Sequence, residues 1–297
     1  MKSITKYIDG WDIAQEVRLE RKVHKGAFLF VEGDTDYKRI RKFIDEVNCS
    51  VVVCFGRDNL EEAIDLLEDE GFPGILGLAD ADFDRCGWGN PSTADNIIYS
   101  VSHDFDLDWM TASVIAAYLG EFGDSQKIEA LGGSAAVLEI AKRRLEPLSI
   151  LRSLNQRGII RMKLSDVDIA AAYNGQNIDV SVLVANISRG INSTQPARTA
   201  LEQRIASEMG QARLWDQFTN GHDTCGMLGI MLRSEIGSRR DSNTYDREIA
   251  AHVRLTYSIN EFCSSQLRRD IESWERTNTP YKILLVNCSA VRTAMVN

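Results

Sequence analysis

The sequence predicts an α/β protein in which a parallel sheet of four strands is flanked by helices and followed by a mainly helical C-terminal region. Short apolar runs at residues 27–31, 50–55, 75–79 and 96–101 contain no charged residue, as is typical of strands buried on both faces. Segments with apolar residues every three or four positions separate the first three runs. Strands that alternate with helices in this way form parallel sheets with right-handed crossovers.

Two crossover helices connect these strands. The first is expected to begin near Asp34 and to carry apolar positions from Tyr37 to Val47. The second covers about 59–70, where the acidic residues are expected to form a solvent-facing side. From about residue 125 helical periodicity dominates, with a strand pair expected near 159–164 and 178–184 and a last strand at 281–286. The predicted organisation is an N-terminal helical segment (1–25), an α/β domain (26–125) and a helical region (126–297).

Composition limits the classes of protein that need to be considered. The net charge of −9 argues against coating nucleic acid by bulk electrostatics. Since no apolar run reaches the ~18 residues of a membrane span and the N-terminus lacks the apolar core of a secretory signal, we expect a cytoplasmic protein without a membrane segment. A P-loop motif is also missing from the sequence, so ATP hydrolysis by that route is not expected.

Acidic residues follow two of the predicted strands directly. Glu32 comes after the first strand, and Asp80, Asp82 and Asp84 alternate after the third. Because ligand sites form at the carboxyl ends of parallel strands, these side chains are expected to converge on Mg²⁺, with Mn²⁺ also accepted. Glu32 would be a further oxygen donor or a general base, and Asp36, one helical turn later, would support the site.

Three other interpretations of these acids compete with the metal site. A calcium loop of the EF-hand type needs Gly at its sixth position and Glu at its twelfth, whereas Arg85 and Pro91 stand there. A phosphatase of the haloacid dehalogenase type also has an Asp pair after a strand, but it does not predict Glu32. The third reading is a polar turn whose acids face solvent, and it stays open beside the metal site.

These motifs carry a resemblance to a known family. Glu32-Gly33-x-x-Asp36 after the first strand and Asp80-x-Asp82-x-Asp84 after the third resemble the Toprim domain of topoisomerases, primases and OLD-type nucleases, over about residues 26–110. The resemblance extends to three further segments: the turn Gly56-Arg-Asp-Asn59, the pair His103-Asp104 and the tripeptide Gly221-His222-Asp223. Together they look like a stand-alone Toprim family related to the OLD nucleases, which includes the toxic effector of the PARIS antiphage system.

The resemblance implies a Toprim-like catalytic domain at 26–125 and a helical region that serves dimerisation, partner binding or substrate binding. Glu32 would act in acid–base chemistry or as a metal ligand, Asp80 and Asp82 would bind metal, and Asp84 would assist. His103 and Asp104 have no family role to transfer, but their position after the fourth strand would suit a supporting contact. The implied partners are a separate ABC-type ATPase sensor that holds the effector and, once it is released, a second copy of the chain.

Arginines provide the candidate contacts to nucleic acid. The densest basic stretch of the chain contains Arg143, Arg144, Arg152, Arg157 and Arg161, and Arg is suited to bidentate contacts with phosphate. Ordinary solvated surface is the competing interpretation.

The sequence therefore leads to three functional hypotheses. The first is a Mg²⁺-dependent endonuclease that acts as an antiphage toxin, with RNA, in particular tRNA, favoured over DNA. The second is a DNA nuclease or nickase that uses the same site. The third is a non-catalytic regulatory module whose acids bind metal only structurally.

Overall fold

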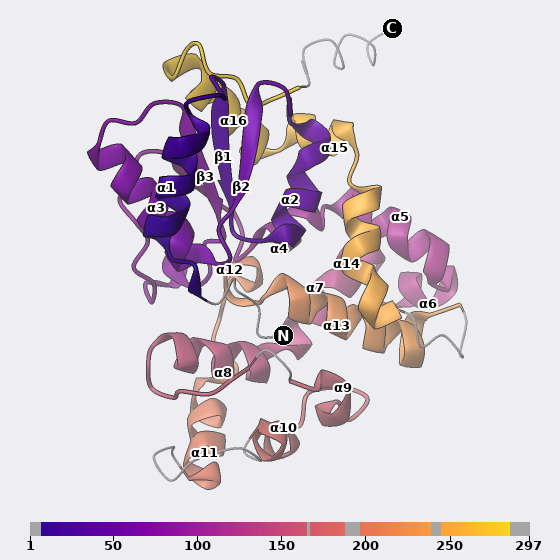
Figure 1. Ribbon diagram of the computed structural model, residues 1–297. Helices are drawn as coiled ribbons and strands as arrows, with labels where there is room; N and C mark the ends of the chain where they lie inside the picture. Colours follow the sequence, from indigo (N-terminus) through magenta and orange to yellow (C-terminus); the bar gives the residue numbers. More distant parts are fainter. Residues whose placement is uncertain (1–6, 165–166, 188–196, 239–244, 286–297) are drawn as a thin grey trace, which may run out of the picture. The chain divides into compact units, whose positions relative to one another are not determined.

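The computed structural model describes residues 7–164, 167–187, 197–238 and 245–285 (Figure 1). It confirms the predicted class: an α/β protein with a four-stranded, all-parallel sheet, flanking helices and a helical C-terminal region. The described chain forms two compact units. The first contains the chain up to Ala81, Pro91–Val101 and the chain from Ser258 onward, and the second contains Asp82–Asn90 and Ser102–Tyr257.

The sheet of the first unit has the strand order β2-β1-β3-β4. Its strands are β1 (Ala27–Val31), β2 (Cys49–Val53), β3 (Ile75–Ala79) and β4 (Ile97–Tyr99). Every pairing is parallel, with Val31 opposite Val53 on β2 and Leu78 on β3. β1 and β3 are buried along their whole length, which agrees with their continuous apolar sequences.

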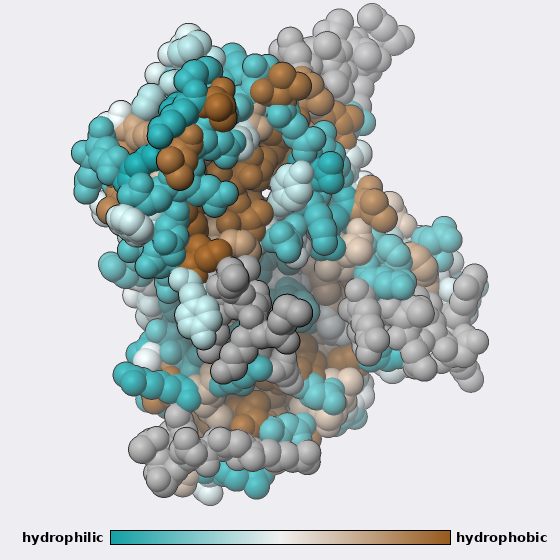
Figure 2. All heavy atoms as spheres, in the orientation of Figure 1, coloured by the Kyte–Doolittle hydropathy of each residue, from teal (hydrophilic) through white to brown (hydrophobic). Residues whose placement is uncertain are grey.

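Helices cover both faces of this sheet. They are α1 (Gly10–Glu20), α2 (Asp34–Ile40), α3 (Arg57–Asp69), α15 (Ile259–Ser264) and α16 (Gln266–Thr277), with a 3₁₀ turn at Arg41–Phe43. Figure 1 shows α1 and α3 on one side of the strands and α2 on the other, and Figure 2 shows mainly hydrophilic residues on the outer surface of α1 and α3.

The core between the sheet and α3 follows from the periods of the two elements. Phe28 and Phe30 are two positions apart and therefore share one face of β1. They belong to the same buried cluster as Leu60, Ile64 and Leu67, which form one side of α3. Each fully buried side chain of this size contributes about 1.5–3 kcal/mol. This cluster anchors α3, which begins at the carboxyl edge of the sheet.

The second unit is helical in the part that the structure describes. Its helices are α4 (Phe105–Trp109), α5 (Ala112–Phe122), α6 (Ser125–Ala130), α7 (Ser134–Arg144), α8 (Glu146–Gln156), α9 (Ile169–Ala172), α10 (Val180–Ile187), α11 (Arg198–Glu208), α12 (Trp215–Phe218), α13 (Gly221–Met231) and α14 (Tyr245–Thr256), with a 3₁₀ turn at Asp84–Cys86 and a π-helical segment at Leu232–Ile236. α13 is the central helix, since it is buried on nearly every side and packs against α4, α7, α9 and α14.

Several boundaries differ from the sequence predictions. The strand expected at 178–184 is wrong, because α10 occupies most of it. Asp179 accepts a hydrogen bond from Val182 N (3.0 Å), and this cap together with the burial of Leu183 and Val184 outweighs the strand preference of the Val-rich run. Its expected partner at 159–164 contains no strand either. Within the described part of the predicted last strand, a single antiparallel bridge joins Leu284 to Ile44, and residue 286 lies outside the described residues.

The division of the chain also differs from the predicted one. α15 and α16 belong to the first unit with the sheet. The Trp274 side chain of α16 donates a hydrogen bond to Asn96, just before β4 (2.7 Å). The first unit is therefore assembled from distant parts of the sequence.

Candidate functional site

The strand order places a ligand-binding position between β1 and β3. From β1 the chain goes outward to β2 and then returns to β3 on the other side of β1. In open α/β sheets, ligands bind outside the carboxyl ends of the strands at such a switch in direction. Glu32 directly follows β1 and Asp80 directly follows β3, so both lie at this position.

The structure brings Glu32 and Asp80 into direct contact. The backbone N–H of Asp80 donates a hydrogen bond of 2.6 Å to Oε1 of Glu32, and both residues are half-buried. The backbone O of Glu32 accepts a second hydrogen bond from Gly56 N, in the loop after β2 (2.9 Å). Glu32 thus ties together the ends of three neighbouring strands, through its carboxylate to Asp80 and through its backbone O to Gly56.

Arg57 adds a cationic side chain to this edge. At the start of α3, its Nη1 donates to the backbone O of Asp80 (3.0 Å), and its Nε donates to Glu61 (2.7 Å). The guanidinium lies over the ring of Tyr99, 5.0 Å from its centroid, and the Tyr99 hydroxyl donates to the same Glu61 oxygen (2.7 Å). Arg57 is therefore held in one orientation beside the two acidic residues.

The local sequence explains how Arg57 reaches this position. Gly56 has a φ of 133°, a conformation that favours glycine, and it lets the chain turn sharply from β2 into α3. Asn59 secures the turn by donating to the backbone O of Cys54 (2.9 Å). Sequence reasoning noted the Gly56–Asn59 turn but did not place Arg57 in the site, although its position at a strand end was a usable signal.

The environment of Arg57 also affects Tyr99. Burial, and then the hydrogen bond to the Glu61 carboxylate, raise the pKa of the Tyr99 phenol well above its usual value. Tyr99 therefore stays protonated and keeps donating to Glu61 throughout the neutral pH range. The acidic side of α3 was expected to face solvent, but its Glu61 binds Arg57 and Tyr99 within the protein.

Asp36 supports the turn after β1. Its Oδ2 accepts a hydrogen bond from Gly33 N (3.1 Å), and its Oδ1 forms an ion pair with the buried Arg39 (2.5 Å). These contacts fix the backbone that follows Glu32.

Asp82 and His103 interact within the second unit. Asp82 N donates to the backbone O of His103 (2.7 Å), and the His103 ring nitrogen Nε2 lies 3.7 Å from the Asp82 carboxylate. Asp82 has a φ of 46°, which is uncommon for a residue with a side chain. Burial lowers the pKa of His103, and the Asp82 carboxylate opposes part of this effect. The geometry connects the residues after β3 with those after β4.

Asp104 and Asp84 have clear structural contacts. The buried Asp104 carboxylate accepts hydrogen bonds from Leu107 N (2.9 Å) and Gly221 N (2.6 Å), so it caps α4 and binds the first residue of α13. A Cβ placed on Gly221 would lie 2.5 Å from Asp104 Oδ1, which explains the glycine. Asp84 packs against Gly89, where a Cβ would overlap its carboxylate.

Most of the arginines predicted to contact nucleic acid form ion pairs with carboxylates. Arg152 binds the buried Asp223 through two hydrogen bonds (2.5 and 2.7 Å). The other two pairs are Arg144 with Glu235 (2.6 Å) and Arg157 with Glu208 (3.1 Å), while Arg143 and Arg161 are exposed.

The carboxylates at the sheet edge are of the chemical type that a hard divalent cation takes as ligands. Within the described ranges no group of three or more His, Cys, Asp or Glu is arranged to hold a metal ion. Mg²⁺, however, is usually held by only one or two carboxylates together with waters and phosphate oxygens. In the first unit, Glu32 and Asp80 would be those carboxylates. Asp82 and Asp84, the other predicted ligands, lie in the second unit.

Comparisons with protein-family models and with curated proteins give no match. No described helix combines the length and the apolar character needed to cross a membrane.

Proposed function

We propose that this protein is a metal-dependent phosphodiester hydrolase, a nuclease whose reaction centre contains Glu32 and Asp80. The observation that carries the proposal is the meeting of these residues at the switch point of the sheet, where the Asp80 N–H binds Glu32 Oε1 at 2.6 Å. Phosphodiester cleavage is favoured because the same edge presents a fixed guanidinium, that of Arg57, and Arg is well suited to binding phosphate.

The residues have separate roles in this proposal. Glu32 and Asp80 would hold Mg²⁺ or Mn²⁺, which would polarise the phosphoryl oxygens and activate a water. Arg57 would orient the phosphate, since the contacts with Glu61 and the Asp80 carbonyl hold it in place. Asp36 keeps the turn after Glu32 in position through Gly33 and Arg39. In the second unit, Asp82 has His103 beside it; its proposed role, and that of Asp84, rests on the Asp80-x-Asp82-x-Asp84 motif alone.

The biological setting rests on the resemblance in the motifs. We propose that the protein is a cytoplasmic toxin of an antiphage system that cleaves RNA, in particular tRNA, after release from an ABC-type ATPase, and that its active form is a homodimer. Support comes from the Toprim-like motifs Glu32-Gly33-x-x-Asp36 and Asp80-x-Asp82-x-Asp84, which lie after β1 and β3 of an all-parallel sheet.

The test is cleavage by the purified full-length chain with tRNA or plasmid DNA, in Mg²⁺, Mn²⁺ or EDTA. We expect tRNA to be cut only with metal, and we expect Glu32→Gln and Asp80→Asn to lose at least a hundredfold in rate. Asp34→Asn is the matched control, because Asp34 is an exposed carboxylate two residues after Glu32, and it should keep full activity.

The outcomes separate the three hypotheses. Nicking of plasmid with intact tRNA would favour the DNA nuclease. Metal binding without cleavage of either substrate would favour the regulatory module. Cleavage that persists in Glu32→Gln would contradict the proposed centre.

A further inference from the structure

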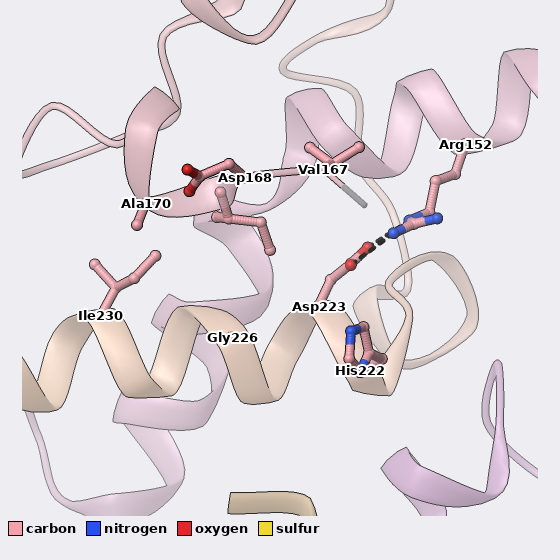
Figure 3. A pocket seen from close by; sticks show the side chains of 9 residues that line it. Arg152, Val167, Asp168, Ala170, His222, Asp223, Gly226 and Ile230 are labelled. Carbon is pink, nitrogen blue, oxygen red and sulfur yellow. Dashed lines mark hydrogen bonds and ion pairs between the residues drawn. The ribbon is translucent and has the colours of Figure 1, made fainter. Parts of the chain in front are cut away.

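A pocket lies within the second unit. It has a volume of about 210 Å³ and is formed by α8, the start of α9, and α13. Figure 3 shows its lining side chains. They are Arg152, Val167, Asp168, Ile169, Ala170, His222, Asp223, Gly226 and Ile230.

One end of the pocket is polar and rigid. Arg152 and Asp223 face each other there and form the ion pair, with His222 on the same turn of α13 (Figure 3). The Asp223 side chain is only 3% exposed, whereas that of Arg152 is 19% exposed. Because Asp223 binds Nε and Nη2, it orients the guanidinium without bonding Nη1.

The other end is mainly apolar, with the Asp168 carboxylate beside Ala170, where it caps α9 by accepting a hydrogen bond from Ala171 N (3.0 Å). Ala170 and Ile230 lie together there, at the far end from His222, and Val167 lies across from α13 (Figure 3). Between the two ends of the pocket, Gly226 has no side chain to occupy the space. A Cβ at this position would come within 3.2 Å of the Ile169 side chain, so a larger residue would narrow the space.

Charge and size define the class of ligand. The lining has one arginine and two carboxylates, Asp168 and Asp223, so its formal charge does not favour a phosphate. Its volume is below the roughly 300–1,000 Å³ of pockets for drug-sized ligands. A fitting ligand is small and uncharged, with apolar faces and an edge that carries hydrogen-bond donors and acceptors.

We propose that this pocket binds a single unpaired nucleobase of the substrate strand. The faces of the base would contact Val167, Ile169 and Ile230, and its edge would meet Arg152 and His222. Proteins commonly read single-stranded nucleic acid through the faces and edges of splayed-out bases. The choice of a nucleobase over another small heterocycle rests on the proposed nuclease function.

The experiment measures binding of free nucleosides to the full-length chain without metal. Adenosine, guanosine, cytidine and uridine are titrated separately, and the methyl resonances of Ile169 and Ile230 are followed by NMR. We expect at least one nucleoside to shift both signals saturably, with a Kd in the millimolar range or tighter. Ala170→Trp should abolish the shifts by filling the pocket. Ala171→Trp is the matched control, because Ala171 is also exposed but does not line the pocket, and it should bind normally.

A second variant covers the case in which Ala170→Trp fails to fold. His222 is exposed, so His222→Ala should fold normally and should weaken binding about threefold to tenfold, as expected for one lost hydrogen bond. The proposal is overturned if no nucleoside shifts the two methyl signals, if the shifts survive in Ala170→Trp, or if inorganic phosphate competes for the same site. Nucleosides contain no phosphodiester bond, so the result does not depend on whether the protein is a nuclease.

Discussion

The pair Arg152–Asp223 provides the sharpest stability prediction. Replacing Arg152 by Ala would leave the Asp223 carboxylate buried without its two charge-assisted hydrogen bonds. Removing one partner of a buried ion pair costs about 3–5 kcal/mol. We expect the lower end, about 3 kcal/mol, because Arg152 is 19% exposed and water reaches the guanidinium. This loss is a large fraction of the about 5–15 kcal/mol that stabilises a typical protein.

Urea unfolding followed by circular dichroism measures this loss. Arg152→Lys keeps the charge but not the two-point contact, so it should lie between wild type and Arg152→Ala. Arg143→Ala is the control, since Arg143 is exposed in the same basic stretch, and it should change stability by less than about 0.5 kcal/mol. If Arg152→Ala unfolds like wild type but binds nucleic acid more weakly, the arginine is a phosphate contact and the structural reasoning is refuted.

Two further predictions concern Gly221 and Tyr99. Gly221→Ala should lower the free energy of unfolding by about 1–3 kcal/mol, because its Cβ would lie 2.5 Å from the Asp104 carboxylate; a melting temperature equal to that of wild type would contradict the packing described for α4 and α13. The pKa of Tyr99 is raised in the folded protein, so its contribution to stability is complete below the phenol pKa of the unfolded chain, about 10, and is lost as the pH rises beyond it. Tyr99→Phe should therefore lose less stability than wild type in alkaline solution, and equal losses in denaturant titrations would show that Tyr99 ionises normally.

Much of the sheet could be predicted because each strand can be recognised from its own apolar sequence. The predicted bounds of β1 (27–31) and β3 (75–79) are confirmed, since both strands are uninterrupted apolar runs that are buried on both faces. α2 was predicted too long, because the 3₁₀ turn that follows Ile40 keeps similar apolar spacing. The placement of Glu32 and Asp80 at neighbouring strand ends followed from the same reasoning.

The roles of Arg57 and Arg152 could not be predicted, because they depend on contacts between residues that are distant in the sequence. The position of Arg57 after a strand was a signal in the sequence, but its contact with the Asp80 carbonyl, which joins residues 23 positions apart, could be seen only once β2, β1 and β3 were neighbours. Nor does the sequence around Arg152 show its ion pair with Asp223, which lies 71 residues away. Arg152 was therefore predicted to contact nucleic acid. Partners that lie this far apart leave no local pattern in a single sequence.

Metal binding by the carboxylates at the sheet edge is the most direct test of the central claim. Titration of the full-length protein with Mn²⁺, with free Mn²⁺ followed by electron paramagnetic resonance, measures it without any substrate. The account predicts saturable binding of Mn²⁺ that is reversed by Mg²⁺. Glu32→Gln and Asp80→Asn should each weaken this binding at least tenfold, and Asp34→Asn should leave it unchanged. Saturable binding that is equally strong in Glu32→Gln, in Asp80→Asn and in wild type would contradict it.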